Sequence, residues 1–578
     1  MKKLIYLITI AFLLPVLSGC EDFLDTKSYT TKDSQSFPKT EEDASQMVVG
    51  VYNSLTRCTN QVMSSYFLIA ELASDDRFGG GGYNDKASQA LGHLMKNEDD
   101  MMNQLWTTHY TGIARANAAL TALETLDEGD LKNQKMGEVR ILRAFFYFEL
   151  VQILGDIPMM SAAPENVQEA MEAPEQVSQD EIYKFIASDL WEAYSTMPST
   201  QWNSVTSGTA TKWAAAGLLA RVWLFYTGFF QKDALPMEEG QITREQVAAA
   251  LNDCISNSGH SLVPDFRSLW PYTNSVTKKD YVYASSIPEW VRDGQNPEHV
   301  FVKKMVPHGT WQSNPQCNEY SLFFGIRNGN NTNYKDLFPM GQGWGMGPVN
   351  TVLWDEWVVD EPEDLRREGS IYNQAIEASN YDGQWGADRM VEETGLWQKK
   401  VVATTAYKPN GTDLWNYFTS DAAYYDIPQD NFQHGCGTDL IYLRYADILL
   451  MQSEITRTAD GINAVRNRAK LAPIAAYSDA ALRKERRYEL AFESLRWGDI
   501  RRWHIAEEVL PKMYGTRIFN ETQFTTMKPQ GGPTIADRYR ATQGFFMIPQ
   551  TQINLAGADK LKQNAGWGSE ATFVQWTE

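Results

Sequence analysis

Between residues 41 and 197 the chain follows the hydrophobic pattern of amphipathic helices, with apolar side chains every three or four positions. An acidic segment that favours a helix start precedes the first series, which spans residues 47–55. A second series is centred on Trp106, and a third covers residues 136–150 and stops at a Gly-Asp-Ile-Pro sequence. These patterns predict a region of mostly buried helices.

A further helix is expected to start at residues 209–211, because Thr-Ala-Thr precedes a run that mixes small and large apolar residues. The spacing of a small residue before a bulky one, as from Ala144 to Phe148, resembles degenerate tetratricopeptide repeats. In such repeats each helix hairpin buries one face against the next. The pattern therefore predicts a mostly α fold with tetratricopeptide-like helix hairpins.

The character of the chain changes between residues 262 and 437. Glycine, asparagine, proline, tryptophan and tyrosine crowd together there, and the helical period largely disappears. Long loops are uncommon in compact domains unless they carry a function, so we expect a loop-rich ligand-binding insertion in this stretch. Helical patterns resume after Asp439. We therefore divide the body of the chain into a helical region, 41–261, and a C-terminal region, 262–578, which contains the insertion.

The first residues have the layout of a secretory signal peptide. Two lysines precede an apolar run over residues 4–17, which is too short to span a bilayer comfortably. The run ends in Leu-Ser-Gly-Cys, which resembles a bacterial lipobox, so we expect residues 1–19 to be removed and the Cys20 thiol to carry a lipid. The alternative is an ordinary cleaved signal peptide with an incidental cysteine.

An acidic stretch follows Cys20 and resembles a signal that places lipoproteins on the outer face of the outer membrane. Residues 20–40 are then a lipid-anchored tether.

The charge balance disfavours nucleic acid as a partner, because the net charge is −21 and nucleic-acid-binding proteins need clustered lysine and arginine. A mean hydropathy of −0.42 is typical of a soluble globular body.

The remaining cysteines do not have the spacing of a zinc site. In an oxidising envelope they could form one or two disulfides, and buried free thiols are equally compatible with the sequence. We predict no cofactor, since the chain has no EF-hand motif, although an irregular calcium site leaves no motif. The cysteines are Cys58, Cys254, Cys317 and Cys436.

Three carboxylates raise the question of catalysis. Glu485, Glu489 and Glu493 are spaced to share one face of a helix. Glycosidases place two carboxylates across a sugar-binding cleft, whereas these three lie among arginines in a mostly apolar segment, so structural ion pairing is the simpler interpretation. The chain also lacks G-x-S-x-G, H-E-x-x-H and Walker motifs. We therefore predict that the protein is not an enzyme.

The loop-rich region offers chemistry that suits carbohydrate. Sugar rings pack their C–H faces on flat aromatic side chains, and sugar hydroxyls need amides, carboxylates or arginine as hydrogen-bond partners. The alternative for any one aromatic ring is that it fills a gap between loops and helices. The candidate ligand-binding residues in this region are Trp270, Tyr272, Tyr283, Trp290, Trp311, Asn314, Tyr320 and Trp344.

A second candidate patch lies early in the chain. Asp75 and Asp76 precede a run of four glycines, and Tyr83 and Asn84 follow it. The glycines predict a mobile or tightly turned loop whose acidic and aromatic flanks could clasp a hydroxyl-rich ligand. The alternative is a solvated turn in which the aspartates are structural caps.

Two segments carry a resemblance to a known family. Residues 442–451 read YLRYADILLM, which resembles the LRYADVLLM signature of the SusD/RagB family. Residues 485–503 are similar to the family's ERRxELAFEGxRxxDLRRW helix, with Ser494 in place of the usual glycine. The Asn-Pro-Glu sequence at 296–298 also looks like a family landmark. The resemblance covers the whole mature chain and implies a SusD-like fold.

The resemblance also implies a function. Members of the family bind a glycan on the cell surface and deliver it to a SusC-like TonB-dependent transporter in the outer membrane. Capture and delivery, without bond breaking, are therefore the expected role of this lipoprotein. The alternatives are a peptide ligand, as for RagB-like relatives, a surface glycoside hydrolase, and a purely structural lipoprotein.

Overall fold

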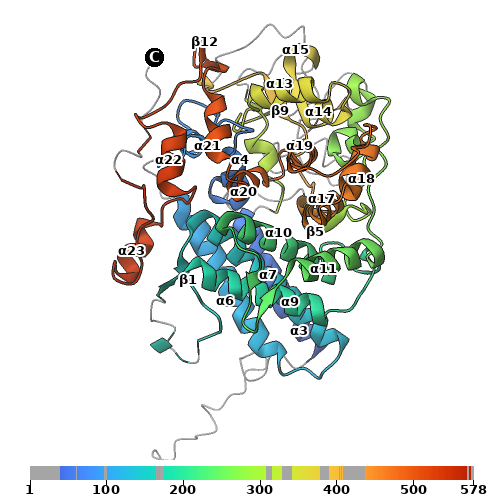
Figure 1. Cartoon of the computed structure of the whole chain (residues 1–578), viewed down its shortest axis with the longest axis vertical. Helices are drawn as coiled ribbons and strands as arrows, with labels where there is room; N and C mark the ends of the chain where they lie inside the picture. Colours follow the sequence, from blue (N-terminus) through green and yellow to red (C-terminus); the bar gives the residue numbers. More distant parts are fainter. Residues whose placement is uncertain are drawn as a thin grey trace, which may run out of the picture.

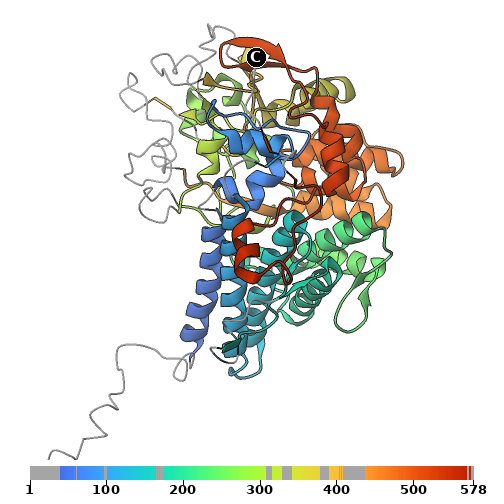
Figure 2. The ribbon, with the colours of Figure 1, turned by 90° about the vertical axis from the view of Figure 1, so that its left-hand side faces the viewer.

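The computed structural model divides the molecule into a helical half and a half in which short helices, short strands and loops alternate (Figure 1). Figure 2 shows α3 (Glu41–Thr59) upright beside the neighbouring helices of the first half. The structure describes residues 40–59, 62–96, 101–164, 166, 168–169, 175–306, 316–327, 342–377, 389–402, 404, 406–407, 436–568 and 572–573.

The first half is a series of long helices that pack on one another in chain order. Each helix contacts the next, and the last of them, α11, also contacts α17 of the C-terminal region. This arrangement confirms the predicted mostly α fold built from helix hairpins. After α3, the long helices are α6 (Met101–Leu123), α7 (Asp130–Leu154), α9 (Gln179–Thr196), α10 (Lys212–Phe230) and α11 (Arg244–Asn257).

Helix α7 is the centre of this half, because it is buried on every side from residue 141 onward. Its polar side chains have partners within the core. Arg143 donates two hydrogen bonds to Asp189 of α9, at 2.8 and 2.7 Å, and Glu149 contacts His109 of α6 at 2.7 Å. Helix α10 is long and apolar enough to cross a membrane, but most of it is buried inside the protein.

The C-terminal region returns to the helical half through a pair of strands. Strand β5 (His299–Lys303) precedes most of the loop-rich region, and β10 (Leu440–Arg444) follows it. The two strands pair antiparallel, with Leu440 opposite Lys303. The short helices here are α12 (Tyr320–Phe323), α13 (Thr351–Asp360), α14 (Leu365–Ser370), α15 (Gln374–Glu377), α17 (Tyr445–Thr456), α18 (Asp460–Arg468), α19 (Asp479–Leu490), α20 (Arg496–Arg502), α21 (Ala506–Val509), α22 (Ile535–Thr542) and α23 (Gln550–Ala556).

The sheets among the described residues all have two strands, and β6 and β7 form the one parallel pair there. The strand pairs besides β5 and β10 are β1 (Ile157–Pro158) with β2 (Gln176–Val177), β3 (Leu235–Pro236) with β4 (Gln241–Ile242), β6 (Ile326–Arg327) with β7 (Gln342–Gly343), β8 (Ile371–Asn373) with β9 (Leu396–Gln398), and β11 (Arg517–Asn520) with β12 (Gln523–Thr526). The further short helices are α4 (Tyr66–Leu72) and α5 (Lys86–Gly92), and the 3₁₀ turns are η2 (Val62–Ser64), η3 (Trp202–Ser204), η4 (Phe266–Leu269), η5 (Pro271–Thr273), η6 (Thr277–Lys279), η7 (Val282–Ala284) and η10 (Leu510–Met513).

The structure corrects two details of the C-terminal prediction. The segment after Asp439 begins as strand β10 and becomes helical only at Tyr445. The helix that carries Glu485 and Glu489 ends at Leu490, so Glu493 lies beyond the helix and does not share its face. Local hydrophobic spacing could not reveal either boundary, because the pairing with β5 and the turn after α19 depend on distant contacts.

Cys58 and Cys254 are buried free thiols, and Cys317 and Cys436 are buried as well. For Cys58 and Cys254 this selects the buried free thiol from the two alternatives left open by the sequence.

The turn after α19 contains Ser494, the position where this chain differs from the family pattern. Ser494 has a φ of 57°, in the left-handed region that favours glycine. Its hydroxyl donates to the carbonyl of Glu493 at 2.7 Å, and its backbone amide donates to the carboxylate of buried Glu71. The usual glycine of the family is therefore explained by the backbone conformation.

We expect Ser494→Gly to raise the free energy of unfolding by about 1 kcal/mol, because it removes the clash of a Cβ atom with a left-handed backbone. Urea denaturation followed by circular dichroism measures the change. Ser188→Gly is the matched control, since Ser188 lies inside α9 and its hydroxyl donates to the carbonyl of Lys184. The control should lower stability by about 0.5–1 kcal/mol. A loss of stability in Ser494→Gly would contradict the strain argument.

Candidate functional site

Four of the predicted aromatic ligands are part of the protein interior. Trp270 and Tyr272 belong to a separate hydrophobic core under the loop-rich region, and the Tyr272 hydroxyl donates to the carbonyl of Gly369 at 2.9 Å. Trp290 is buried, and Tyr320 packs on Phe67 with ring centroids 4.8 Å apart. Rings enclosed in this way offer no face to a sugar, so the structure assigns these four a packing role.

Asp75 and Asp76 are also structural. Both are buried, and both face arginines of the C-terminal region. Arg496 holds both carboxylate oxygens of Asp75, at 2.7 and 2.8 Å, while Arg487 reaches Asp76 at 2.8 Å. Burial alone would raise the pKa of Asp75, but Arg496 and Arg487 outweigh it and lower that pKa below its usual range. The two aspartates are therefore structural, but as buried ion-pair partners rather than as caps of a solvated turn.

The glycine run between them and Tyr83 is a tight turn enclosed by two other segments. The amide of Gly81 donates to the carbonyl of Gly345 at 2.8 Å, and the amide of Gly80 donates to buried Glu392 at 2.9 Å. A Cβ atom at Gly80 would lie 2.5 Å from the carbonyl oxygen of Gly345, so no larger side chain fits there. These contacts give Tyr83 and Asn84, directly after the turn, a fixed position.

The same contacts bring Trp344 to this turn, although 260 residues separate it from Asn84 in the chain. Arg327 joins the two segments, because its Nη1 donates to Asp85 at 3.2 Å and to the carbonyl of Trp344 at 3.1 Å. The Trp344 ring lies half-buried against Phe323. One residue of the predicted loop-rich patch, Trp344, thus lies next to the predicted patch around the glycine run.

A second arginine covers Tyr83. The guanidinium of Arg389 lies 3.5 Å from the centre of the Tyr83 ring and pairs with Glu521. The group formed by Tyr83, Asn84, Asp85, Arg327, Trp344 and Arg389 is called the Tyr83–Trp344 surface below. It combines the Tyr83 ring, the exposed amide of Asn84 and two arginines, each of which faces a carboxylate, with the backbone of half-buried Trp344, whose ring packs on Phe323.

The sequence did not predict Arg327 or Arg389, since neither stands in a motif and both reach the site only through the fold.

Tyr283 lies elsewhere, half-buried beneath the ammonium group of Lys399 at 3.8 Å. Its predicted ligand contact stays a prediction. Trp311, Asn314 and Cys20 lie outside the described residues.

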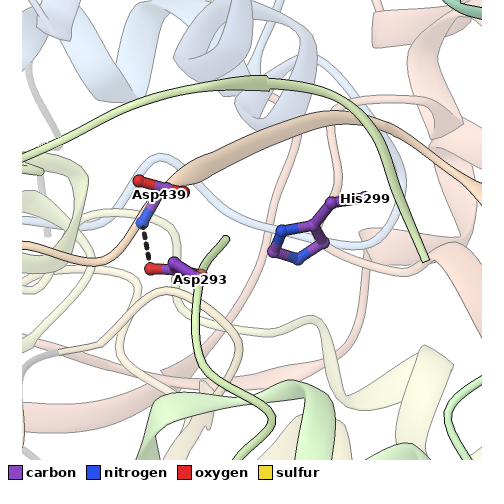
Figure 3. A group of neighbouring side chains, drawn as sticks. All are labelled: Asp293, His299 and Asp439. Carbon is purple, nitrogen blue, oxygen red and sulfur yellow. Dashed lines mark hydrogen bonds between the residues drawn. The ribbon is translucent and has the colours of Figure 1, made fainter. Parts of the chain in front are cut away.

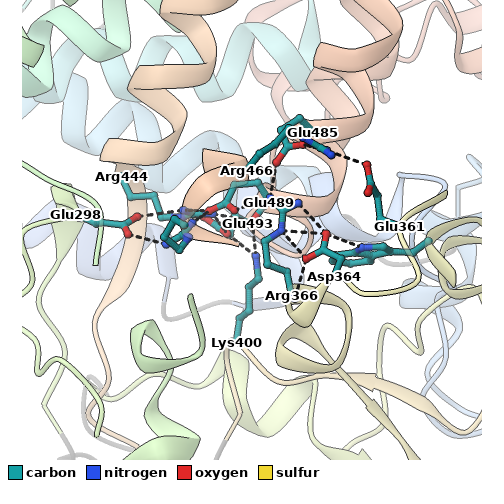
Figure 4. A network of polar contacts seen from close by, with 12 residues as sticks. Glu298, Glu361, Asp364, Arg366, Lys400, Arg444, Arg466, Glu485, Glu489 and Glu493 are labelled. Carbon is teal, nitrogen blue, oxygen red and sulfur yellow. Dashed lines mark hydrogen bonds and ion pairs between the residues drawn. The ribbon is translucent and has the colours of Figure 1, made fainter. Parts of the chain in front are cut away.

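The three candidate catalytic glutamates form a buried ion-pair network with arginines and a lysine (Figure 4). Glu489 is its centre and contacts Arg366, Arg444 and Arg468. Glu485 pairs with Arg366 and Arg466, and Glu493 pairs with Arg444 and Lys400. Burial alone would raise the pKa of Glu489, but Arg468, Arg444 and Arg366 outweigh it and hold that pKa well below its usual range.

This arrangement of buried ion pairs stabilises the fold and is unsuited to general acid catalysis. A general acid needs a raised pKa and access to substrate, and Glu489 has neither. Glu493 borders a cavity of only about 20 Å³, which holds little more than one water molecule. Burial raises the pKa of Glu485, but its side chain is buried and pairs with Arg366 and Arg466, so it has no access to substrate either. The network therefore gives no support to a glycosidase centre formed by these carboxylates.

One group of side chains has the composition of a cation site (Figure 3). Asp293, His299 and Asp439 each offer a ligand atom within 4.8 Å of the other two. Asp439 already pairs with the ammonium group of Lys304 at 2.5 Å and accepts from the amide of Met305. A cation would therefore have to displace the charge of Lys304, so the residues present do not fit a preformed metal centre.

Comparisons with known proteins agree with this architecture. Residues 22–224 match a SusD-like family described as starch-binding and associating with the outer membrane, and residues 350–567 match the SusD family. The chain is 25% identical to SusD-like protein P2 of Formosa agariphila over 536 residues, which cover 88% of this chain and 92% of that protein.

Solved structures show the same fold. Surface glycan-binding protein A from Bacteroides fluxus matches 91% of this chain and 99% of its own with a TM-score of 0.66 and 23% identity. Surface glycan-binding protein A from Bacteroides thetaiotaomicron, solved in complex with laminarihexaose, matches 91% of this chain and all of its own with a TM-score of 0.65 and 19% identity. The fold and the two family matches together define a SusD-like helical protein. The chain belongs to the SusD/RagB family.

We expect Glu489→Gln to lower the free energy of unfolding by about 3–5 kcal/mol, because it leaves buried arginines without their shared carboxylate. The lowered pKa means that this stabilisation is complete above about pH 4.3 and is lost as the pH falls and Glu489 becomes protonated. Denaturation of both proteins at pH 7 and pH 3 measures the difference.

Glu507→Gln is the matched control, since Glu507 pairs with Arg540 on the exposed surface. Its effect should stay below about 1 kcal/mol. Equal effects of the two substitutions at pH 7 would contradict the central role of Glu489.

Proposed function

We propose that the protein captures a glycan on the cell surface and delivers it to a SusC-like TonB-dependent transporter. The observation that carries the proposal is the Tyr83–Trp344 surface, where the fold brings the Tyr83 ring, an exposed amide and two arginines to the segment that carries half-buried Trp344. Aromatic faces accept the C–H faces of sugar rings, and the polar groups offer partners to hydroxyls. Two proteins of similar fold are named as surface glycan-binding proteins, and this supports a glycan as the ligand.

The charges of this surface favour a neutral glycan over a peptide. Arg327 faces Asp85 and Arg389 faces Glu521, so the two positive charges are already balanced by carboxylates of the chain. A carboxylate of a peptide would have to compete with these pairs. Hydroxyl groups can accept from the same guanidinium groups without separating the ions.

Binding without bond breaking is the proposed contribution. The carboxylates of the C-terminal signature are committed to the buried network, and the capture role requires no cofactor. The expected lipid on Cys20 would hold the protein on the outer membrane, facing the cell exterior, where it can meet both the polysaccharide and the transporter.

Tyr83→Ala and Trp344→Ala should each weaken glycan binding about tenfold, because each removes an aromatic ring whose stacking is worth roughly 1 kcal/mol or more. For Tyr83 the stacking face is the one opposite Arg389. Isothermal titration calorimetry with laminarihexaose, other plant and microbial oligosaccharides, and mixed peptides measures the effect. The panel also separates the two ligand classes, since saturable binding of peptides alone would overturn the glycan proposal.

Trp191→Ala is the control for this experiment. Trp191 is half-buried on α9, in the helical half of the molecule, and packs on Tyr194. It should leave glycan affinity unchanged. A loss of affinity as large as that of Trp344→Ala would show that tryptophan removal acts through stability and not through stacking.

Cys20→Ser should release the protein from the membrane, because the thiol that would carry the lipid is absent. Fractionation of cells that express each protein, followed by protease treatment of intact cells, measures anchoring and surface exposure. Membrane retention of the variant would contradict a lipid anchor at Cys20, and protease resistance of the parent protein would contradict surface display.

A further inference from the structure

A cavity of about 290 Å³ lies between the helical half and the segment around the start of β5, apart from the Tyr83–Trp344 surface, with which it shares no residue. Its wall is formed by η3, by the segment that leads into α10, and by the segment that leads into β5. The volume is close to the lower end of the roughly 300–1,000 Å³ that small-molecule sites occupy. The cavity therefore suits a small ligand or one unit of a chain.

The wall carries no formal charge. It contains no aspartate, glutamate, lysine or arginine among the described residues that form it. Burial lowers the pKa of His260 to about 4, and burial together with Lys304 and His260 lowers the pKa of His299 to about 3. Both imidazoles are neutral at neutral pH. In a chain with a net charge of −21, such a wall selects an uncharged ligand.

One part of the wall is an aromatic face. The half-buried ring of Trp202 stacks on His260 at 6.0 Å, and His260 stacks in turn on Tyr445 at 6.3 Å. The indole N–H of Trp202 already donates to the carbonyl of Gly259 at 3.0 Å. The ring is thereby held in one orientation before any ligand arrives, which reduces the entropy lost on binding.

Another part of the wall has polar atoms without partners. Asn296 is 1% exposed, and its side-chain nitrogen has no hydrogen-bond partner among the described residues. The same holds for the hydroxyl of Thr211 and for both ring nitrogens of His299. A buried polar group without a partner destabilises the protein, and a ligand with hydroxyl groups would supply the missing hydrogen bonds.

We propose that this cavity is a second saccharide site, which holds one neutral sugar residue against Trp202 and bonds its hydroxyls to Asn296, Thr211 and the neighbouring polar wall. Ser207 and Thr209 also border a larger cavity of about 500 Å³, which gives room for a chain to continue. A second point of attachment raises the retention of a long polysaccharide through effective concentration, without tighter contacts at either site.

Saturation-transfer NMR with the methyl glycosides of glucose, galactose, mannose and xylose tests the proposal. The experiment uses the Tyr83→Ala/Trp344→Ala double variant, in which the Tyr83–Trp344 surface is disabled. We expect transfer to at least one neutral glycoside, with affinity reduced at least tenfold when Trp202→Ala is added. Methyl glucuronide, which carries a charge, should receive no transfer.

Two further variants separate ligand contact from folding. Trp202→Phe keeps an aromatic face and should retain most of the signal. Ser207→Leu changes an exposed residue on the rim and should reduce binding by filling the cavity, without removing a buried contact. Unchanged thermal unfolding of Ser207→Leu is the control for folding.

The proposal is overturned if no neutral glycoside receives transfer from the parent protein, or if the Tyr83→Ala/Trp344→Ala change alone abolishes transfer. Equal binding of the glucuronide would also contradict it, because an uncharged wall should not accept a carboxylate. Failure of the proposed capture surface gives a different result. In that case the Tyr83→Ala and Trp344→Ala single variants would bind oligosaccharide with unchanged affinity.

Discussion

The pairing of buried charges is the constraint on which the C-terminal region depends. Glu489 on α19 binds Arg444 at the end of β10 and Arg366 on α14, so one carboxylate connects a signature helix, the returning strand and the loop-rich region. An unpaired charge in this position would cost several kcal/mol, and the network is stable only when all of its parts are present. The loops that lack a helical period are therefore held by electrostatics as well as by their own small core.

The Tyr83–Trp344 surface also depends on a buried carboxylate that has partners on neighbouring segments. Glu392 is fully buried, pairs with His93 at 2.8 Å and accepts from the amide of Gly80. The glycine turn is thus held by the carboxylate of Glu392 and by backbone hydrogen bonds to the segment around Gly345. A rigid support of this kind lets a surface loop present Tyr83 and Asn84 in a defined geometry, which a recognition site requires.

The sequence predicted which residue types gather in the loop-rich region better than it predicted where each residue lies. Trp270, Tyr272 and Trp344 stand in similar surroundings of glycine, proline and asparagine, yet only Trp344 reaches the surface described above. Aromatic rings serve a core and a sugar equally well, and a region without hydrophobic period has no pattern that separates its buried from its exposed positions. The same lack of pattern hid Trp202, because a tryptophan in a short turn has no periodic neighbours.

By itself the sequence determined the helical half and the family signature, because helix periodicity and motifs are local properties of the chain. Only the tertiary structure decided that Asp75 is a structural ion-pair partner, that Glu493 lies beyond its helix, and that Arg327 joins Asp85 to Trp344. Each of these depends on contacts between residues far apart in the chain, and the burial that sets the role and the pKa of a carboxylate arises only when those segments pack together.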